Sequence, residues 1–435
     1  MALTAETDAA GARSHENSRR SLIASSIGNL LEWYDFAAYG YMAVVMGSLF
    51  FPSGSEATSL LLSFATFGVA FAIRPLGGAI IGPLGDKIGR RTVLCIVVLG
   101  ISAATFAMGL LPTYASIGIV APILLVLLRM VQGFCAGGEV GGAITFVAEA
   151  APTARRGYYA SWIQSSAVLG FFLGLSTPTV LSAVLPGDAL ESWAWRVPFL
   201  VAGPLGLIGL YIRLKLEETP NFKELEESGK VADSVTREVF GRSWGNIFLA
   251  AGIGIPLQMG YFMILTYVPS YLKTALDYSS TTAYFATGTA IVADLLVIPF
   301  AAVLSDRVGR KPGMLVAAIA FVVGAVPLFM MIQGGGIPAF VALGILGALH
   351  GVYLGFCGAA LAEIFATRNR YGGLSVGHNI GAAVFGGATP FMATFLVDRT
   401  GNNLMPAFLI LGCCLLSLVA IFAMKDRAGQ PLVQE

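Results

Sequence analysis

The chain has 435 residues, of which 56% are hydrophobic and 12% charged, with a formal net charge of +1 at pH 7. Soluble domains carry about 25% charged residues, so this composition favours a membrane protein. The small net charge, with no basic cluster interleaved with stacking aromatics, argues against nucleic acid as a partner. The five cysteines lie in apolar stretches without metal-ligand spacing, so neither a disulfide framework nor a metal site is predicted.

The first twenty residues are polar and lack the apolar core of a signal peptide, so we expect a disordered tail over 1–20. Twelve apolar runs follow, each long enough to cross a bilayer, which takes about 20 residues. The runs are 21–47, 57–81, 92–111, 117–149, 157–185, 194–214, 244–271, 281–304, 313–332, 338–365, 373–397 and 406–424. An all-α membrane protein with twelve transmembrane helices is therefore predicted, and the even number places both termini on one side.

Basic residues give the orientation of these spans. Both tails and alternate connections hold 21 of the 26 Lys and Arg residues. Because loops rich in Lys and Arg stay in the cytoplasm, both termini are expected there. The longest connection divides the runs six and six, which predicts a tail 1–20, an N-terminal six-helix bundle 21–214, a cytoplasmic linker 215–243, a C-terminal six-helix bundle 244–424 and a tail 425–435.

A short motif recurs at equivalent places in the two bundles. Residues 85–91 read GDKIGRR after the second run, and residues 305–311 read SDRVGRK after the second run beyond the linker. Duplicated six-helix halves favour alternating access, with a site between them near the membrane midplane. Each Asp can meet a helix N-terminus or an Arg of the facing segment, and each Gly permits a tight turn. The predicted gating residues are Gly85, Asp86, Gly89, Arg90, Asp306, Gly309 and Arg310.

The first run carries two carboxylates in apolar surroundings. Asn29, Glu32, Asp35 and Tyr39 are spaced by three, three and four residues, so a helix places them in one stripe. A charged group at membrane depth is costly unless it faces a wet cavity or a partner, so the stripe is predicted to face a pathway. A structural pair satisfied by a neighbouring Arg is the alternative.

Two arginines lie inside later runs of the same half. Arg74 and Arg129 each need a carboxylate or a bound anion at membrane depth. Gln132 and Glu139 can share a helical face with Arg129. We expect Arg74 or Arg129 to meet a substrate carboxylate, while a carboxylic acid in a low-dielectric cavity exchanges a proton. A purely structural ion pair between Arg129 and Glu139 is the competing interpretation.

The second half offers a more aromatic set of candidates. Aromatic faces can hold a quaternary ammonium by cation–π attraction, although core packing or an interfacial position also explains such rings. A buried His is likewise either a proton relay or hydrogen-bonded structure. The predicted substrate-binding residues of the whole chain are Asn29, Tyr34, Tyr39, Arg74, Arg129, Gln132, Gln164, Gln258, Tyr261, Tyr267, His350, Tyr353, His378 and Asn379. The predicted proton-coupling residues are Glu32, Asp35, Glu139 and Asp294.

The paired loops and the twelve runs together resemble the major facilitator superfamily. More narrowly, the segments 29–36, 74–78, 129–139 and 217–222 resemble those of the metabolite:proton symporter family. The resemblance covers nearly the whole chain after the first tail. It implies two pseudo-symmetric six-helix bundles in the bacterial inner membrane that import small polar metabolites with protons. Proline, betaine, oxoglutarate, citrate and shikimate are among the metabolites that this family imports.

Further segments indicate which branch of this family the chain resembles. Residues 261–272, 365–371 and 403–407 resemble the proline/betaine transporter branch. The chain departs from that branch by stopping at Glu435, without its long heptad-bearing tail, so the resemblance leaves osmotic regulation open. Glu363 and the glycines at 386–387 also resemble shikimate- and dicarboxylate-type members, which leaves a carboxylate substrate open.

Other function classes find less support in the sequence. The phosphate-binding Gly-x-x-x-x-Gly-Lys-Ser/Thr loop does not occur, which argues against direct use of ATP, and no enzyme motif for zinc or serine hydrolysis occurs either. A channel would not need repeated gating loops, and a sensor would need a soluble domain. We therefore predict a monomeric, lipid-embedded, proton-coupled symporter, not an enzyme, that takes up a proline- or betaine-like zwitterion and uses no cofactor besides the proton. Uptake of a dicarboxylate, tricarboxylate or shikimate-like acid, and export by proton antiport, are the alternatives.

Overall fold

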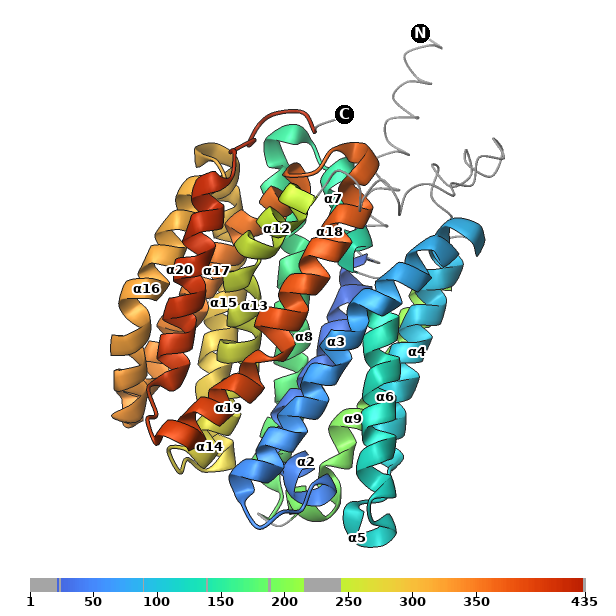
Figure 1. The fold of residues 1–435 in the computed structure, drawn as a ribbon, viewed down its shortest axis with the longest axis vertical. Coiled ribbons are helices and arrows are strands. Elements are labelled where there is room, and N and C mark those ends of the chain that lie inside the picture. The colour runs from blue at the N-terminus through green and yellow to red at the C-terminus, as the bar shows by residue number, and fades with distance from the viewer. Residues whose placement is uncertain are drawn as a thin grey trace.

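The computed structural model describes residues 22, 25–88, 90–137, 140–186, 189–214 and 244–432 (Figure 1). Throughout these ranges the regular elements are helices, as the apolar runs predict. The predicted tail 1–20 and the predicted linker 215–243 lie outside the described residues.

The first half begins with a helical run over residues 25–41, which α2 (Ala43–Phe50) extends. Its other elements are α3 (Glu56–Ile88), α4 (Arg90–Leu110), α5 (Tyr114–Ile117), α6 (Val120–Ala136), α7 (Val140–Ala150), η1 (Thr153–Arg155), α8 (Arg156–Val184), η2 (Leu190–Ala194) and α9 (Arg196–Leu214).

The second half begins with four short elements that together form one span. These are α12 (Trp244–Ile253), α13 (Ile255–Met259), η3 (Gly260–Tyr267) and α14 (Val268–Thr274). The remaining elements are α15 (Ser280–Val308), α16 (Lys311–Gln333), α17 (Gly336–Glu363), α18 (Thr367–Gly381), η4 (Ala382–Gly387), α19 (Thr389–Thr400) and α20 (Met405–Ala423).

The described helices account for all twelve predicted spans. Nine of them are long and apolar enough to cross a membrane, and α12 to α14 form a tenth span that is bent by 41°. The shorter apolar helix α6 and the helical run over 25–50 complete the set. Hydropathy and length are local properties of the chain, which is why the sequence locates these spans correctly.

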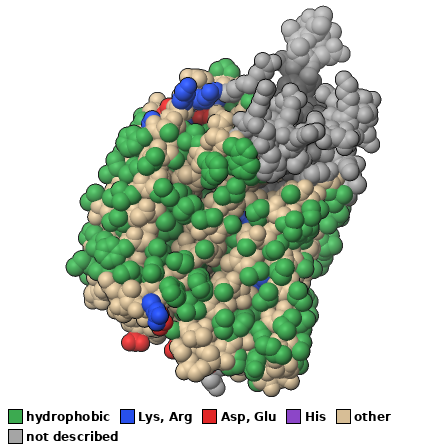
Figure 2. Space-filling model, in the orientation of Figure 1, with side chains coloured by type: hydrophobic (Ala, Val, Ile, Leu, Met, Phe, Trp, Pro, Cys, Tyr) green, Lys and Arg blue, Asp and Glu red, His purple; other side chains and the backbone are tan. Residues whose placement is uncertain are grey.

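Large apolar side chains cover the outside of the helical body. Phe300 of α15, Val323 of α16 and Val419 of α20 are 75%, 71% and 69% exposed. Figure 2 shows hydrophobic side chains spread over the visible face, while most of the visible charged side chains gather at its two ends. This distribution suits a surface that contacts lipid along its sides and water at its ends.

The two repeated motifs extend their helices further than the apolar runs indicate. Helix α3 continues to Ile88 and α15 continues to Val308, so the first residues of each motif are helical. Gly309 then ends α15 with φ at +97°, a conformation that favours glycine. The tight turn expected at Gly309 is therefore present, whereas Gly89 lies outside the described residues.

The duplication is visible in helix packing as well as in the motifs. Gly133 of α6 packs on the backbone of Ala70 of α3, so closely that a Cβ there would lie 1.9 Å from the Ala70 oxygen. Gly347 of α17 packs on Ala290 of α15 in the same way, with a corresponding distance of 2.0 Å. Small residues allow this close approach of helices in lipid, and its recurrence supports two equivalent halves.

The two halves meet along a small set of helices (Figure 1). Helix α8 packs on α15 and α17, and α3 packs on η4 and α19. Two of the spans in the second half contain π-helical turns, η3 and η4, at this junction. Such turns break the regular hydrogen-bond ladder and are frequent at functional sites.

Candidate functional site

The polar stripe of the first span points into the protein. The side chains of Asn29, Glu32, Asp35 and Tyr39 are all buried, with at most 2% exposure. Asn29 Nδ2 donates to the backbone oxygen of Ile163 and to Ser166 Oγ of α8, at 2.9 Å each. The stripe therefore faces other helices, and its predicted position on a transport pathway stays a prediction.

Glu32 and Arg74 form an ion pair at the centre of the first half. Arg74 Nη2 lies 2.6 Å from Glu32 Oε1, and both side chains are fully buried. The guanidinium carbon lies 4.5 Å from the centroid of the Phe36 ring and 4.6 Å from that of Phe71. In this conformation Glu32 has the Arg partner that the structural interpretation of the stripe required. Glu139, a further predicted proton-coupling residue, lies outside the described residues.

Arg129 has a different environment. Its Nη2 donates to the Phe67 backbone oxygen at 3.1 Å, and its Nη1 donates to Gln132 Oε1. Its guanidinium carbon lies 4.5 Å from the centroid of Tyr39, 4.9 Å from Phe67 and 5.2 Å from Phe36. Within the described part of the chain no carboxylate pairs with this fully buried guanidinium.

A cluster of aromatic rings joins the two halves. Trp33 lies 4.7 Å from Tyr261 and 5.3 Å from Phe171, measured between ring centroids, and Phe171 stacks on Tyr261 at 5.5 Å. Tyr261 Oη of η3 donates to Gln164 Oε1 of α8 at 2.9 Å. Tyr261 and Gln164 are among the predicted binding residues, whereas Trp33 and Phe171 are not, because nothing in the sequence distinguishes these two rings from core residues. We call Trp33, Phe171 and Tyr261 the aromatic cluster.

The polar candidates of the second half form two pairs. His350 Nδ1 of α17 lies 2.6 Å from Asp294 Oδ2 of α15, and both side chains are fully buried. Gln258 Nε2 of α13 lies 3.3 Å from His378 Nε2 of α18. Asp294 was predicted to couple protons and His350 to bind substrate, whereas the structure brings the two side chains together.

The remaining candidates lie away from this centre or join other elements. Tyr34 donates to the Pro198 backbone oxygen of α9 at 2.7 Å, and Tyr353 donates to the Ile253 backbone oxygen. Tyr267 packs against Phe64 of α3, with ring centroids 6.0 Å apart. Asn379 Nδ2 donates to the Gly137 backbone oxygen at 3.1 Å and so links α18 to the end of α6.

At the end of the molecule that carries the basic loops, the second motif contacts the first half. Asp306 Oδ1 accepts from the backbone N–H of Gly157 at 2.8 Å, and its Oδ2 accepts from that of Tyr158 at 2.9 Å. These N–H groups belong to the first turn of α8, so Asp306 meets a helix N-terminus as predicted. Arg310 Nη1 also donates to Asp306 Oδ1, at 2.8 Å. The side chains of Asp86 and Arg90 in the first motif lie outside what the structure describes, and for Gly85 it gives only helical backbone.

Two further ion pairs cross between the halves at the same end. Arg156 Nη1 lies 2.9 Å from Glu363 Oε1, and Arg310 also contacts Glu363, with Nη2 3.1 Å from the same oxygen. Arg370 Nη1 lies 2.6 Å from Glu149 Oε1. None of these four residues is among the predicted gating residues: Arg156, Arg370, Glu149 and Glu363. Their recurrence at equivalent places in the two halves was the signal that could have identified them.

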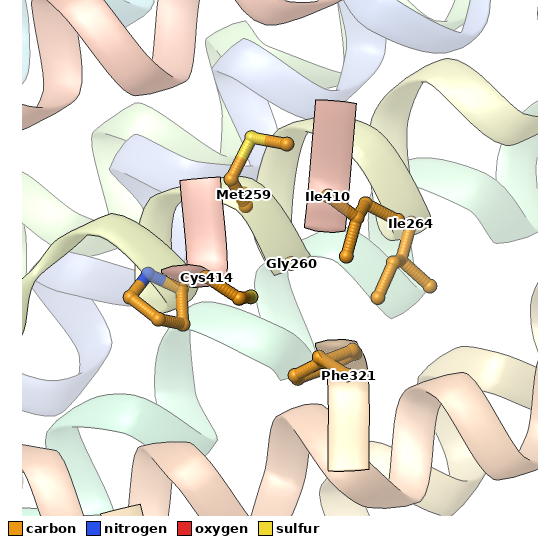
Figure 3. Close-up of a pocket in the computed structure, with 7 residues that line it drawn as sticks. Met259, Gly260, Ile264, Phe321, Ile410 and Cys414 are labelled. Carbon is orange, nitrogen blue, oxygen red and sulfur yellow. The ribbon is translucent and has the colours of Figure 1, made fainter. Parts of the chain in front are cut away.

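The opposite end also joins the halves. Tyr284 Oη of α15 donates to the Tyr41 backbone oxygen at 3.1 Å, and Thr281 Oγ1 donates to the Ser182 backbone oxygen of α8 at 3.0 Å. Hydrogen bonds or ion pairs therefore join the two halves at both ends of the molecule. A separate hollow in the second half, shown in Figure 3, has no room for a water molecule. Apolar residues and one glycine line it, namely Pro256, Met259, Gly260, Ile264, Phe321, Ile410 and Cys414, so it offers no group to bind a polar solute.

Comparison with protein families and solved structures identifies the fold. Residues 21–243 match the model of the sugar (and other) transporter family, and residues 251–434 match that of the major facilitator superfamily. The proton:xylose symporter XylE bound to 6-bromo-6-deoxy-D-glucose superposes with a TM-score of 0.75 at 19% identity, covering 96% of this chain and 98% of that chain. A partially occluded inward-open structure of XylE from E. coli gives the same TM-score and identity, covering 96% and 100%. The predicted twelve-helix, two-bundle fold is confirmed.

Proteins of similar sequence indicate the branch of the superfamily to which the chain belongs. The glycine betaine/proline/ectoine/pipecolic acid transporter OusA of Dickeya dadantii is 39% identical over 424 residues, which cover 95% of this chain and 84% of that protein. The proline/betaine transporter of Escherichia coli K12 is 38% identical over 427 residues, covering 95% and 85%. The ectoine/proline transporter ProP of Corynebacterium glutamicum is 36% identical over 430 residues. The chain is therefore an integral membrane transporter of the major facilitator superfamily and belongs to the branch of the proline/betaine transporters.

Proposed function

We propose that this transporter is a proton-coupled symporter that imports a small zwitterion carrying a carboxylate and an ammonium group. Proline and glycine betaine are the first candidates, because the names of the similar proteins include them. The observation that carries the proposal is Arg129, a fully buried guanidinium without a carboxylate partner in the described part of the chain.

Arg129 supports recognition of a carboxylate. A charge at membrane depth requires a compensating anion, and the three surrounding rings compensate only in part, by about 0.5 to 2 kcal/mol per cation–π contact. The present partner, Gln132, is neutral and also donates from Nε2 to Thr105 Oγ1 at 2.9 Å. A substrate carboxylate would replace this amide oxygen with a charged acceptor that matches the planar fork of the guanidinium.

The aromatic cluster supports recognition of the ammonium group. Its rings come from both halves, so a cation held there would contact both halves at once. A chain of rings leads from it towards Arg129, because Phe262 lies 5.9 Å from Trp33 and 4.8 Å from Phe71. A zwitterion lying along these rings would place its ammonium group at the aromatic cluster and its carboxylate near Arg129.

Glu32 supports proton coupling. Protonation of its carboxylate would remove the negative partner of Arg74, so the pair would weaken and the first half could rearrange. Asp35 on the same buried stripe, Glu139 and Asp294 remain further predicted proton-coupling residues. Transport by the Glu32→Gln, Asp35→Asn and Asp294→Asn variants distinguishes three of these carboxyl groups.

Alternating access would use the contacts at the two ends of the molecule. We place the termini and the basic loops in the cytoplasm, with six-helix bundles over 21–214 and 244–424 and a linker over 215–243. The ion pairs around Glu363, together with Asp306, would then close the cytoplasmic side and break when that side opens. The recurring motif and the equivalent glycine contacts support two halves that rock against each other.

One observation favours a second candidate, a dicarboxylate or tricarboxylate substrate. Arg74 and Arg129 lie against the same ring, with guanidinium carbons 4.5 and 5.2 Å from the Phe36 centroid. Two guanidinium groups on one ring would suit an anion with two charges, provided that Glu32 released Arg74. Uptake measurements can separate the two candidates.

The test is uptake into proteoliposomes under an inward proton gradient. Labelled proline, glycine betaine, oxoglutarate, citrate and shikimate are offered under one protocol, with and without a protonophore and with protein-free liposomes as the control. We expect accumulation of the zwitterions that collapses with the protonophore. Uptake of the acids alone would replace the proposal by the second candidate, and accumulation insensitive to the protonophore would refute proton coupling.

A further inference from the structure

We propose that His350 and Asp294 form a proton-binding site in the second half of the transporter, which holds one exchangeable proton in the occluded state. Its use in transport rests on the proposed function, whereas its existence does not. Asp294 lies at the middle of α15 and His350 at the middle of α17, and neither side chain is exposed. The pair therefore lies at membrane depth, in the half opposite Glu32.

Hydrogen-bond chemistry fixes the number of protons in the pair. His350 Nε2 lies 3.1 Å from the Leu257 backbone oxygen, and a carbonyl oxygen only accepts, so Nε2 carries a proton. His350 Nδ1 lies 2.6 Å from Asp294 Oδ2 on the other side of the ring. A second proton must lie between these atoms, because a bare nitrogen lone pair and a carboxylate oxygen would repel each other at that distance. The pair with both protons has no net charge.

The surroundings favour this loaded form. Asp294 Oδ1 is buried and has no hydrogen-bond partner among the described residues. Apart from this pair, the charged residues of α15 and α17 lie at the end with the basic loops, at Asp306, Arg307 and Glu363. The titratable side chains close to the pair are Tyr261 of η3 and Tyr353 and Cys357 of α17, whose ordinary forms at neutral pH are uncharged. The basic residues of the neighbouring helices α8, α14 and α16 lie at helix ends, at Arg156, Lys273 and Lys311, and α13 carries no charged residue. A net negative pair in the middle of α15 and α17 would therefore find no basic partner beside it.

The pair is connected to the aromatic cluster. The His350 ring meets the Tyr261 ring edge to face, with centroids 5.0 Å apart. Gly260, the preceding residue, has no side chain because a Cβ there would lie 1.9 Å from His350 Cδ2. Movement of the imidazole would therefore move η3, and with it the Tyr261 hydroxyl that donates to Gln164 of the first half.

This arrangement gives the pair a role in a transport cycle. A proton from the outside water adds to the pair and forms the N–H or O–H bond that joins His350 to Asp294. When the halves open to the inside, the same proton leaves to water, and a neutral imidazole and a carboxylate remain until the next cycle. The negative pair is costly in the closed core, so the transporter would occlude more readily with the proton bound.

Nitrogen NMR of the histidines tests the site itself. The chain has three histidines, so ¹⁵N-histidine labelling gives few signals, and the His350→Gln variant identifies those of His350. In detergent or nanodiscs we expect Nε2 to be protonated and Nδ1 to carry the shift of a nitrogen that shares a proton. The Asp294→Asn variant should return Nδ1 to the shift of an unprotonated nitrogen. A wild-type His350 with a fully unprotonated nitrogen at both mildly acidic and mildly alkaline pH would overturn the proposal.

Transport by Asp294→Asn tests the role in coupling. We expect loss of accumulation under a proton gradient, so that inside and outside concentrations become equal, while counterflow continues at the wild-type rate or faster. Cys357→Ser on the same helix is the matched control and should keep accumulation. A parallel loss of counterflow and accumulation would indicate a merely structural residue, and wild-type accumulation would also overturn the coupling role.

The NMR spectra and the transport assay test separate claims, so one claim can be wrong while the other holds. If the wild type transports none of the five solutes, the proposed function is wrong, but the NMR result still decides whether the pair holds a proton. If Asp294→Asn does not fold, the wild-type and His350→Gln spectra give the same decision.

Discussion

Arg156 at the start of α8 and Glu363 at the end of α17 form a buried ion pair across the two halves, with Nη1 and Oε1 2.9 Å apart. The counterpart pair joins Arg370 of α18 to Glu149 of α7 at 2.6 Å. In each half the Arg follows the Glu by seven residues, yet each Arg pairs with the Glu of the other half. The duplicated sequence therefore produces two reciprocal ion pairs that join the halves at one end of the molecule.

Glu363→Gln should open this end of the transporter. The change removes the carboxylate that pairs with Arg156 and one of the two carboxylates that pair with Arg310. Removing one partner of a buried ion pair costs roughly 3–5 kcal/mol. Distances between spin labels on α8 and α17 should shift to longer values. Glu149→Gln is the matched control with a smaller effect, because Glu149 is 34% exposed while Glu363 is 4% exposed. A larger opening in the control would contradict this account.

Asp306→Asn should free the first turn of α8. The carboxylate accepts from two backbone N–H groups, and hydrogen bonds to a charged acceptor contribute about 1.5–3 kcal/mol each. Hydrogen exchange at Gly157 and Tyr158 should become roughly tenfold faster or more, with substrate affinity unchanged. Glu191→Gln, exposed at the other end, should leave this exchange as in the wild type. Weaker substrate binding without faster exchange would remove Asp306 from the gate.

Arg129→Lys should weaken substrate binding. Lysine keeps the charge but cannot offer the planar fork to a carboxylate, so the half-saturating substrate concentration should rise roughly tenfold, about 1.4 kcal/mol. Arg129→Gln should abolish uptake. Concentration-dependent uptake in proteoliposomes measures both effects, with the exposed Arg399→Lys as the control. Wild-type saturation in Arg129→Lys would show that the substrate carboxylate lies elsewhere.

Glu32→Gln and Asp35→Asn should separate binding from proton coupling. Each amide keeps the shape of the side chain but cannot exchange a proton at neutral pH, so proton-driven accumulation should be lost while counterflow persists. The same preparations measure both, with the exposed Ser48→Ala as the control. If both variants accumulate substrate like the wild type, neither carboxylate takes part in coupling.

Asp426 should make stability depend on pH in the acid range. Burial alone raises the pKa of Asp426, but hydrogen bonds from the backbone N–H groups of Lys311 and Ala428 outweigh it, and the pKa is lowered. A carboxyl group with a lowered pKa in the folded state contributes stability at neutral pH, and the contribution is lost as pH falls below about 3.9.

Thermal unfolding of Asp426→Asn measures this contribution. At neutral pH the variant should lose about 1 kcal/mol of stability, and the difference from the wild type should shrink in acid. The exposed Asp398→Asn should show neither effect. A difference that persists unchanged in acid would mean that packing, and not the charge of Asp426, stabilises the loop.

The sequence by itself determined the spans, the duplication and the family. Hydropathy over about 20 residues is set locally by the cost of apolar surface in water and of polar groups in lipid. The repeated motif around Asp86 and Asp306 could be read without knowing any contact. So could the polar stripe from Asn29 to Tyr39, because helical spacing alone places its members on one face.

Only the tertiary structure decided which of these groups meet. Glu32 pairs with Arg74, Asp294 pairs with His350, and Trp33 packs on Tyr261 across the junction of the halves. Helical spacing gives the face that a side chain occupies but not the neighbouring helix, its rotation or its height in the membrane. Those depend on close glycine contacts and on the breaks at η3 and η4, which arise from packing of the whole chain.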